Sequence, residues 1–385
     1  MRQQHSQKYN LVDRDTDIPV NEMLQQVTST PNAKEFPLRE AHELVRDLMT
    51  PNPRIYWADF LFHITLGWAA FFTALYTPLF SVWQILSYLV ATLSLYRAVI
   101  FVHELAHLKK GTFQTFRLVW NLMCGIPSLC PSFTYDGVHS DHHKPDIYGT
   151  SRDGEYIPFA TRNPREMISH ILLSFALPLL FIGRFLLLTP LSYLIPPLRK
   201  LVWERMSSLT IDMNYRRAEN AIRNDKNWRL QEFGAFLFAA STLTLIALDL
   251  LPYQGLILWY IICMSIFFLN SIRTLAAHAY QNSGEYRMGF VEQYLDSINI
   301  SGNAFTTELW APLGLRYHAT HHLFMSMPYH NLGKAQHRLI NGLSDNTIYL
   351  KTLRNGLCDA LRRIWSEASA TKKVVRVCSN QGAKN

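Results

Sequence analysis

Charged residues are scarce in this sequence, at 17% of 385 residues against ~25% in an average soluble domain. None of the five cysteines forms a C-x-x-C pair, which argues against a zinc ribbon, a rubredoxin-type module and a disulfide framework. No G-x-G-x-x-G motif occurs, so a dinucleotide-binding fingerprint is absent. Because 49% of the residues are hydrophobic and 13% aromatic, a disordered chain is also excluded.

The hydrophobic residues are collected into long runs, and the charges lie between them. No charged residue occurs between Asp59 and Arg97, which leaves room for two helices of ~20 residues with a break at Thr77-Pro78. A second apolar pair is interrupted only by Pro-Tyr-Gln-Gly at 252–255. We therefore predict four membrane-spanning helices in two hairpins, at about 56–76, 82–102, 235–252 and 255–275.

Lysine and arginine are distributed unevenly over the loops. The turns at 77–81 and 252–255 carry none, whereas the segment 199–229 carries eight. The positive-inside rule then places that segment, both termini and the region 103–165 in the cytoplasm. Basic cytoplasmic loops account for the net charge of +8, so we expect no nucleic acid partner.

The apolar stretch 168–198 is ambiguous. It is too short for two crossings, and one crossing would separate the histidines before it from those after it. We expect it to re-enter the membrane or lie flat on the cytoplasmic side.

Nine of the 15 histidines fall into a recurring pattern. Residues at i, i+3 and i+4 share one helix face, so H-x-x-H-H directs three imidazoles, and H-x-x-x-H two, at one place. The boxes are HELAH, HSDHH and HATHH, and one histidine stands alone at the end of the last predicted span; together they comprise His103, His107, His139, His142, His143, His278, His318, His321 and His322.

Neutral imidazole is a ligand for Zn, Cu, Fe and Ni, and nine imidazoles are about right for two ions. The predicted fold class is an all-α integral membrane protein with a cytoplasmic helical cap that holds a histidine-rich di-metal site. We divide the chain into a polar N-terminal segment (1–55) without a signal peptide, a membrane domain (56–345) and a basic cytoplasmic tail (346–385).

HELAH also matches the zinc protease signature H-E-x-x-H, in which Glu104 would be the general base. An intramembrane zinc protease is therefore an alternative, although it leaves six clustered histidines without a role. A metal-binding or transport protein without catalysis is a further alternative.

The three boxes, in this order around two helix pairs, resemble those of the membrane-bound fatty acid desaturase family. RTLAAHAYQN around His278, EQYLDSINI and LRYHATHHLFMSMPYHNLG are similar to its bacterial branch, and the likeness covers about residues 50–345. The resemblance implies a non-haem di-iron centre, ligated by the nine histidines, that activates O2 at the cytoplasmic ends of four helices. A bacterial inner membrane is the implied location.

The resemblance identifies the superfamily more sharply than the reaction. Desaturation of a fatty acyl lipid is the leading interpretation, and lipid hydroxylation or oxidative decarboxylation to a terminal alkene at the same centre is the alternative. A redox-inert zinc ion cannot supply the oxidant for an alkyl C–H bond. The chain carries no flavin, nicotinamide or haem motif, so electrons must come from a ferredoxin, rubredoxin or cytochrome with its reductase. Some relatives have an Asn four residues before the lone histidine, where this chain has Thr274.

Groups that accept the free imidazole N–H should orient the ligands. The candidates are Glu104, Asp141, Asp146, Asp296, Glu308 and His330. For Arg97, near the end of the second span, we favour an extended side chain that reaches the membrane interface over an ion pair.

Overall fold

The computed structural model describes residues 36–109, 111–218, 226–282 and 286–382. These residues are mostly helical and divide into two compact units. The membrane unit comprises 51–274, 280–288 and 367–382, and the C-terminal unit comprises 36–50, 275–279 and 289–366. Residues 1–35 of the predicted N-terminal segment and 383–385 of the predicted tail lie outside the described residues.

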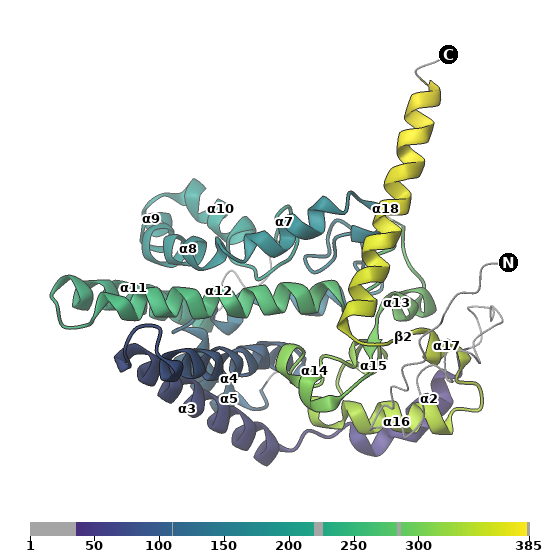
Figure 1. Cartoon of the computed structure of the whole chain (residues 1–385), viewed down its shortest axis with the longest axis horizontal. Coiled ribbons are helices and arrows are strands. Elements are labelled where there is room, and N and C mark those ends of the chain that lie inside the picture. The colour runs from purple at the N-terminus through teal and green to yellow at the C-terminus, as the bar shows by residue number, and fades with distance from the viewer. Residues whose placement is uncertain (1–35, 110, 219–225, 283–285, 383–385) are drawn as a thin grey trace. The chain divides into compact units, whose positions relative to one another are not determined.

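The membrane unit holds the long apolar helices (Figure 1). Its elements are α3 (Pro53–Tyr76), α4 (Val82–His107), α5 (Gln114–Trp120), a π-helix η2 (Asn121–Gly125), η3 (Ser132–Thr134), α6 (Val138–His142), η4 (Phe159–Thr161), α7 (Arg165–Leu173), α8 (Leu177–Ile182), a π-helix η5 (Gly183–Leu188), α9 (Thr189–Leu194), α10 (Pro196–Arg205), α11 (Lys226–Ala247) and α12 (Tyr253–Leu275).

Helices α3 and α4 form the first hairpin and lie side by side in Figure 1. The Asn52 side chain accepts a hydrogen bond from Arg54 N at the start of α3, and Pro53 occupies its first turn, where a missing N–H costs nothing. The Ser81 side chain caps α4 by accepting from Gln84 N at 3.1 Å. Both helices run longer than the sequence predicts, and α4 continues through the first histidine box.

Helices α11 and α12 follow one another across the short turn 248–252 and correspond to the second predicted pair. Helix α11 begins at Lys226, well before the predicted 235, and ends at Ala247. It stops there because Asp249 adopts a left-handed φ of 57° and the Leu250 N–H turns back to Leu245 O. Helix α12 matches its predicted range to within two residues.

Five helices in the described residues are long and apolar enough to cross a membrane, by length and composition. Four correspond to the predicted spans, and the fifth is the continuous stretch Leu177–Leu194 formed by α8, η5 and α9. The chain is therefore a membrane protein, and the number of crossings stays a prediction.

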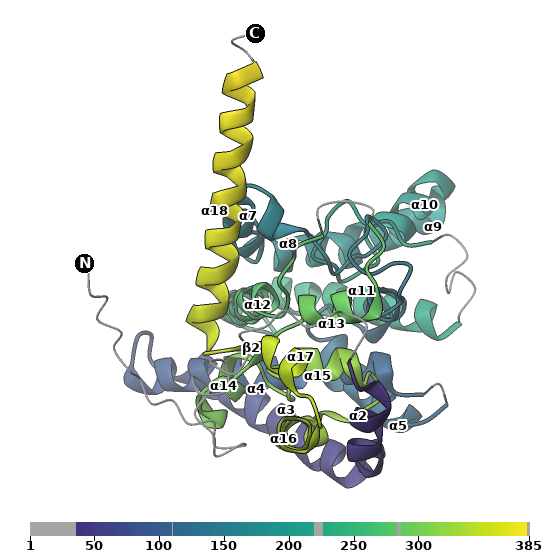
Figure 2. The ribbon, with the colours of Figure 1, turned by 90° about the vertical axis from the view of Figure 1, so that its right-hand side faces the viewer.

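The C-terminal unit is built from shorter elements around its own core (Figure 2). They are α2 (Leu38–Val45), η1 (Arg46–Leu48), α13 (Phe290–Asp296), β1 (Asn299–Ile300), α14 (Ala304–Trp310), α15 (His318–Leu323), η6 (Tyr329–Asn331), α16 (Leu332–Gly342), α17 (Thr347–Lys351), β2 (Leu353–Arg354) and α18 (Leu357–Gly382). Strands β1 and β2 pair in parallel, and α18 runs on into the membrane unit after Ser366.

The core of this unit brings together residues that are far apart in the sequence. Ala41 and Val45 of α2 pack with Leu339 of α16 and with Tyr349 of α17. Asp47 of η1 forms an ion pair with Arg338 of α16. Residues on either side of the predicted boundaries at 55 and 345 thus share one hydrophobic core.

Candidate metal centre

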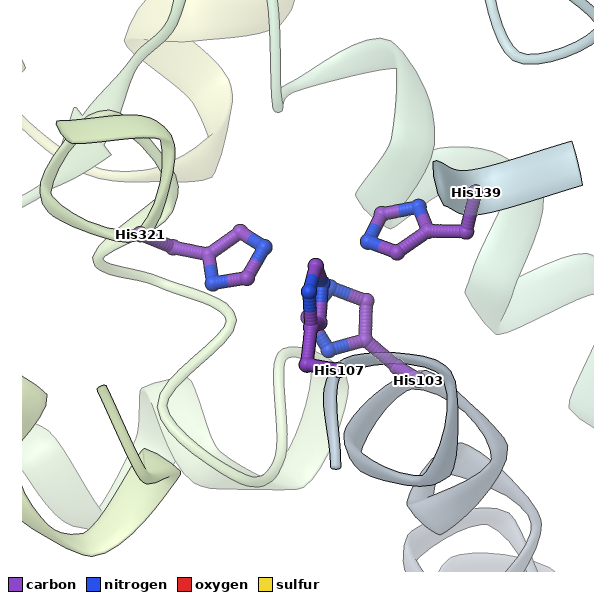
Figure 3. A group of neighbouring side chains, drawn as sticks. All are labelled: His103, His107, His139 and His321. Carbon is purple, nitrogen blue, oxygen red and sulfur yellow. The ribbon is translucent and has the colours of Figure 1, made fainter. Parts of the chain in front are cut away.

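The membrane unit brings imidazoles from α4 and α6 together. His103 and His107 lie one turn apart at the end of α4, and their ring centroids are 5.0 Å apart. The His139 ring lies 4.4 Å from His103 and 4.6 Å from His107. Figure 3 shows these three side chains directed toward one another; the fourth that it labels, His321, belongs to the other unit.

The second box follows a turn that only glycine adopts readily. Gly137 precedes α6 with a φ of 86°, and Pro145 follows the box, so the helix is one turn long. His139 and His142 are buried in this helix. The His143 Nε2 atom lies 3.2 Å from His139 Nε2.

Two carboxylates, one fully buried and one half-buried, contact the second box. The His142 Nδ1–H donates to Asp153 Oδ2 at 2.8 Å, and the His139 Nδ1–H donates to Glu155. Asp153 is fully buried and also accepts from Gly149 N and Glu155 N, each at 2.9 Å. With Nδ1 used as a donor, each ring presents the Nε2 lone pair to its other side.

Tyr135 completes this arrangement. Its hydroxyl donates to Glu155 Oε1 at 2.6 Å, and its ring stacks on that of His139. Burial raises the pKa of Glu155 and raises that of Tyr135 well above its ordinary value. The Tyr135 hydroxyl therefore keeps its proton and remains a donor.

Glu104 of HELAH lies beside the first box. Its Oε2 accepts a hydrogen bond from the Tyr56 hydroxyl, and its Oε1 lies 3.7 Å from His103 Nδ1. Both residues are buried in the membrane unit. A carboxylate held by a phenol and placed against an imidazole suits orientation of that ring.

The C-terminal unit contains a second group of four imidazoles. His318 Nε2 lies 2.8 Å from His278 Nε2 and 3.1 Å from His322 Nε2. The His321 and His318 ring centroids are 5.9 Å apart. One segment thus supplies the lone histidine, and the single helix α15 supplies the other three.

Backbone and side-chain hydrogen bonds fix α15 against the EQYLDSINI segment. His278 forms an isolated bridge with Ser297, and Asn299 accepts from the Thr320 N–H at 3.1 Å. The Thr320 hydroxyl lies 2.6 Å from the Tyr349 hydroxyl. Arg316 is buried and donates from Nε to Ile300 O at 3.0 Å. These contacts hold the segments around His278, EQYLDSINI and HATHH next to one another in the C-terminal unit.

Comparison with known proteins identifies the family. A sequence model of the fatty acid desaturase family matches residues 79–352. The chain belongs to this family. It is 37% identical over 323 residues to a ceramide hydroxylase from Caulobacter vibrioides (strain NA1000 / CB15N), which covers 84% of this chain and 91% of that protein. No solved structure matches the chain.

The donor set fits the metal centre that the desaturase family suggests. Two nitrogens that bind one ion at about 2.1 Å, roughly at right angles, lie about 3 Å apart. The Nε2 separations of 2.8 Å, 3.1 Å and 3.2 Å within the two histidine groups are close to this value. The chain is accordingly an oxygen-dependent, lipid-modifying oxidoreductase of the desaturase and hydroxylase family.

The orienting role of the other predicted residues stays a prediction. Asp141 pairs with Lys144, and Asp146 with Arg152, each as a short-range ion pair. The His330 ring contacts the Tyr329 ring. Asp296 and Glu308 belong to α13 and α14, where Asp296 is buried and its carbonyl accepts from Ala279 N.

The sequence did not predict two of the carboxylates that contact the second box. Asp153 and Glu155 flank Gly154, after the second box and outside any helix that follows it. Their sequence separation from the histidines of the second box matches no helical period. The available signal in the sequence was their position between that box and the next apolar stretch.

Proposed function

We propose that this protein is an O2-dependent lipid hydroxylase that acts on an alkyl chain of a ceramide. The similarity to the ceramide hydroxylase carries the proposal, because it extends over most of both chains. This reverses the order given by sequence analysis, which placed desaturation first.

We further propose that the nine histidines ligate two iron ions in one centre. The nine ligands would be His103, His107, His139, His142, His143, His278, His318, His321 and His322. Two iron ions would supply the activation of O2 that an unactivated alkyl C–H bond requires.

The protein groups have defined tasks in this proposal. Asp153 and Glu155 hold the Nδ1 protons of His142 and His139, which keeps the Nε2 atoms available as ligands. Glu104, fixed by Tyr56, orients His103. Imidazole ligands without a carboxylate bridge distinguish this donor set from that of soluble di-iron bundles.

Hydroxylation consumes one O2, two electrons and two protons, and yields one alcohol and one water. The two electrons must come from a separate protein. We propose a ferredoxin, a rubredoxin or a cytochrome with its reductase, acting at the cytoplasmic side of a bacterial inner membrane.

Desaturation is the second candidate, and the match to the fatty acid desaturase family model favours it. It uses the same O2 and electrons but removes two hydrogens from the lipid and releases two waters. The two products therefore differ by whether an oxygen atom is retained.

Lipid profiling tests the reaction. Expression in a ceramide-producing bacterial host, under isotopically labelled O2, should yield ceramides with one additional labelled oxygen atom. Lipids that lose two hydrogens and gain no label would establish desaturation instead. Unaltered lipids in a host that supplies the electron donors would contradict both candidates.

Metal analysis tests the centre. The purified protein should hold about two iron ions per chain, and His318→Ala should lower the iron content and abolish turnover while the protein still inserts. His337→Ala, on the exposed surface of α16, is the control and should retain both. One bound zinc ion without iron would contradict the proposal and favour a zinc protease.

A further inference from the structure

A pocket in the membrane unit lies where α9, α10 and α11 meet. It has a volume of about 300 Å³ and is lined by Ser192, Tyr193, Pro196, Arg199, Lys200, Trp203, Trp228 and Arg229. None of the nine histidines or their carboxylate partners contributes to it. Three of these described lining residues are cationic and none is acidic, so the pocket favours an anion.

The charged groups that contact the pocket lining also favour an anion. Glu232 is fully buried and accepts hydrogen bonds from Arg184 at 2.6 Å and from both terminal nitrogens of Arg199 at 2.8 Å. The Tyr193 hydroxyl also donates to Glu232 at 3.0 Å. One carboxylate thus balances two guanidinium groups, and the lining residue Lys200 pairs with Glu204 at 3.6 Å. Two carboxylates therefore face four basic groups, Arg184, Arg199, Lys200 and Arg229, so positive charge exceeds negative charge around the pocket.

The folded chain orients these groups firmly. Arg184 lies in the π-helical segment η5 and also donates to Met206 O at 2.7 Å. The Arg199 guanidinium lies over the Tyr193 ring, 4.3 Å from its centroid, and 5.2 Å from that of Trp228. A guanidinium held by a carboxylate and by aromatic faces is already ordered before an anion arrives, which lowers the entropy cost of binding.

Trp228 supplies a donor without an acceptor. It lines the pocket, its side chain is 2% exposed, and its indole Nε1–H has no hydrogen-bond partner among the described residues. A buried donor of this kind destabilises the folded chain unless an acceptor reaches it. An oxyanion in the pocket is an acceptor of the required type.

The surroundings of the pocket are apolar and exposed. Leu194 of α9 is 78% exposed, and Leu230 and Phe233 of α11 are 67% and 53% exposed. Because α9 and α11 belong to candidate membrane spans, such side chains suit contact with lipid tails. These side chains add no binding free energy for a soluble anion. A lipid can bind both through its headgroup in the pocket and through its acyl chains on these side chains.

We propose that this pocket binds the phosphate headgroup of an anionic glycerophospholipid. Arg199, Lys200 and Arg229 provide the positive field, Trp228 provides a donor, and the acyl chains lie along α9 and α11. Basic pockets between membrane helices are suited to acidic lipid headgroups. The site is separate from the proposed oxidation of a ceramide, which carries no phosphate, and does not depend on that reaction.

Lipid titration of the purified full-length protein tests the site. Phosphatidylglycerol, phosphatidylcholine and inorganic phosphate are added separately to the protein in neutral detergent, and native mass spectrometry measures the bound fraction. Phosphatidylglycerol should bind best. The double variant Lys200→Gln/Arg229→Gln should bind it roughly 30-fold more weakly, since each basic group near an anionic headgroup contributes about a fivefold effect.

A matched control removes the same charges from the same helices. Arg205→Gln/Lys226→Gln changes one arginine on α10 and one lysine on α11, both exposed and outside the pocket lining. It should bind phosphatidylglycerol like the unmodified protein. All four residues are exposed, and the thermal midpoint without added lipid shows whether each variant is folded.

Three results would overturn the proposal. Equal losses in the two double variants would show a diffuse charge effect. Equal binding of phosphatidylcholine would remove the role of net negative charge. Binding of inorganic phosphate as tight as that of phosphatidylglycerol would assign the pocket to a soluble anion.

Discussion

Asp153 accepts hydrogen bonds on both carboxylate oxygens. Oδ1 accepts from Glu155 N, Oδ2 accepts from Gly149 N, and both lie within 3.0 Å of His142 Nδ1. An amide cannot reproduce this pattern, because either orientation places its NH2 group against a backbone N–H. The orientation of the His142 ring therefore depends on a side chain with two accepting oxygens at this position.

Asp153→Asn should lower iron content and turnover by about 10–100-fold, the range typical of residues that orient metal ligands. Iron per chain and product formation are the measurements. Asp249→Asn is the matched control: Asp249 is exposed with a left-handed φ of 57°, which asparagine also adopts, so both quantities should stay unchanged. Wild-type iron content in Asp153→Asn would refute the orienting role.

Glu104→Gln separates the two interpretations of HELAH. Glutamine can still accept from Tyr56, so we expect turnover to fall by about 10–100-fold and not to vanish. Removal of a zinc protease base would instead end all chemistry. Complete loss together with bound zinc would therefore support the protease, and Tyr56→Phe should show a milder defect of the same kind.

At the scale of elements, the geometry of the site depends on where short helices begin and end. Helix α4 runs to His107, which places both histidines of the first box on one continuous face. Helix α6 starts directly after Gly137, whose φ of 86° and ψ of −37° lie outside the regions that other residues favour. The direction of the second box thus depends on one glycine.

Gly137→Ala should destabilise the protein by about 1–2 kcal/mol through backbone strain alone. A Cβ at this position would meet nothing within 4 Å, so packing does not contribute. The thermal midpoint in detergent and the iron content should both fall. Gly183→Ala has equally open surroundings but a helical backbone, so its midpoint should stay the same or rise; equal losses in both variants would exclude the strain argument.

The ion pair in the first hairpin belongs to the same scale. Arg97 donates to both carboxylate oxygens of Asp59, at 2.8 Å and 2.7 Å, so α3 and α4 are joined by a bidentate pair. The preference for an extended Arg97 side chain that reaches the interface was wrong. Between two apolar helices, a pair with good geometry costs less than two separately desolvated charges.

At the scale of the whole molecule, the number of membrane crossings decides whether both histidine groups can serve one centre. Box one ends α4, and His278 follows α12. If Leu177–Leu194 crosses the membrane once, the segments before and after it lie on opposite sides. Our proposal of a shared di-iron centre therefore requires this stretch to re-enter or lie flat.

Single-cysteine variants test the topology with a membrane-impermeant thiol reagent, in a background without the five native cysteines. Cysteines at Thr77 and Gln254 should react in intact cells. Cysteines at Arg162, Arg216 and Lys334 should react only after permeabilisation, because basic segments remain inside. Opposite behaviour of Arg162 and Arg216 would establish a crossing by Leu177–Leu194 and contradict the shared centre.

The sequence by itself determined the membrane helices, the family and the histidine boxes. Long apolar runs must be helical in a bilayer, since every backbone N–H and C=O needs a partner there, and H-x-x-H-H is a local pattern. Only the tertiary structure decided which polar side chains meet. Asp153 reaches His142, Glu155 reaches His139, Asn299 reaches Thr320 and Arg97 reaches Asp59. The contacts made by Asp153, Glu155 and Asn299 depend on loop paths, and the Arg97 pair depends on how two helices meet. Neither the loop paths nor the packing of these two helices can be predicted from a periodic pattern in the sequence.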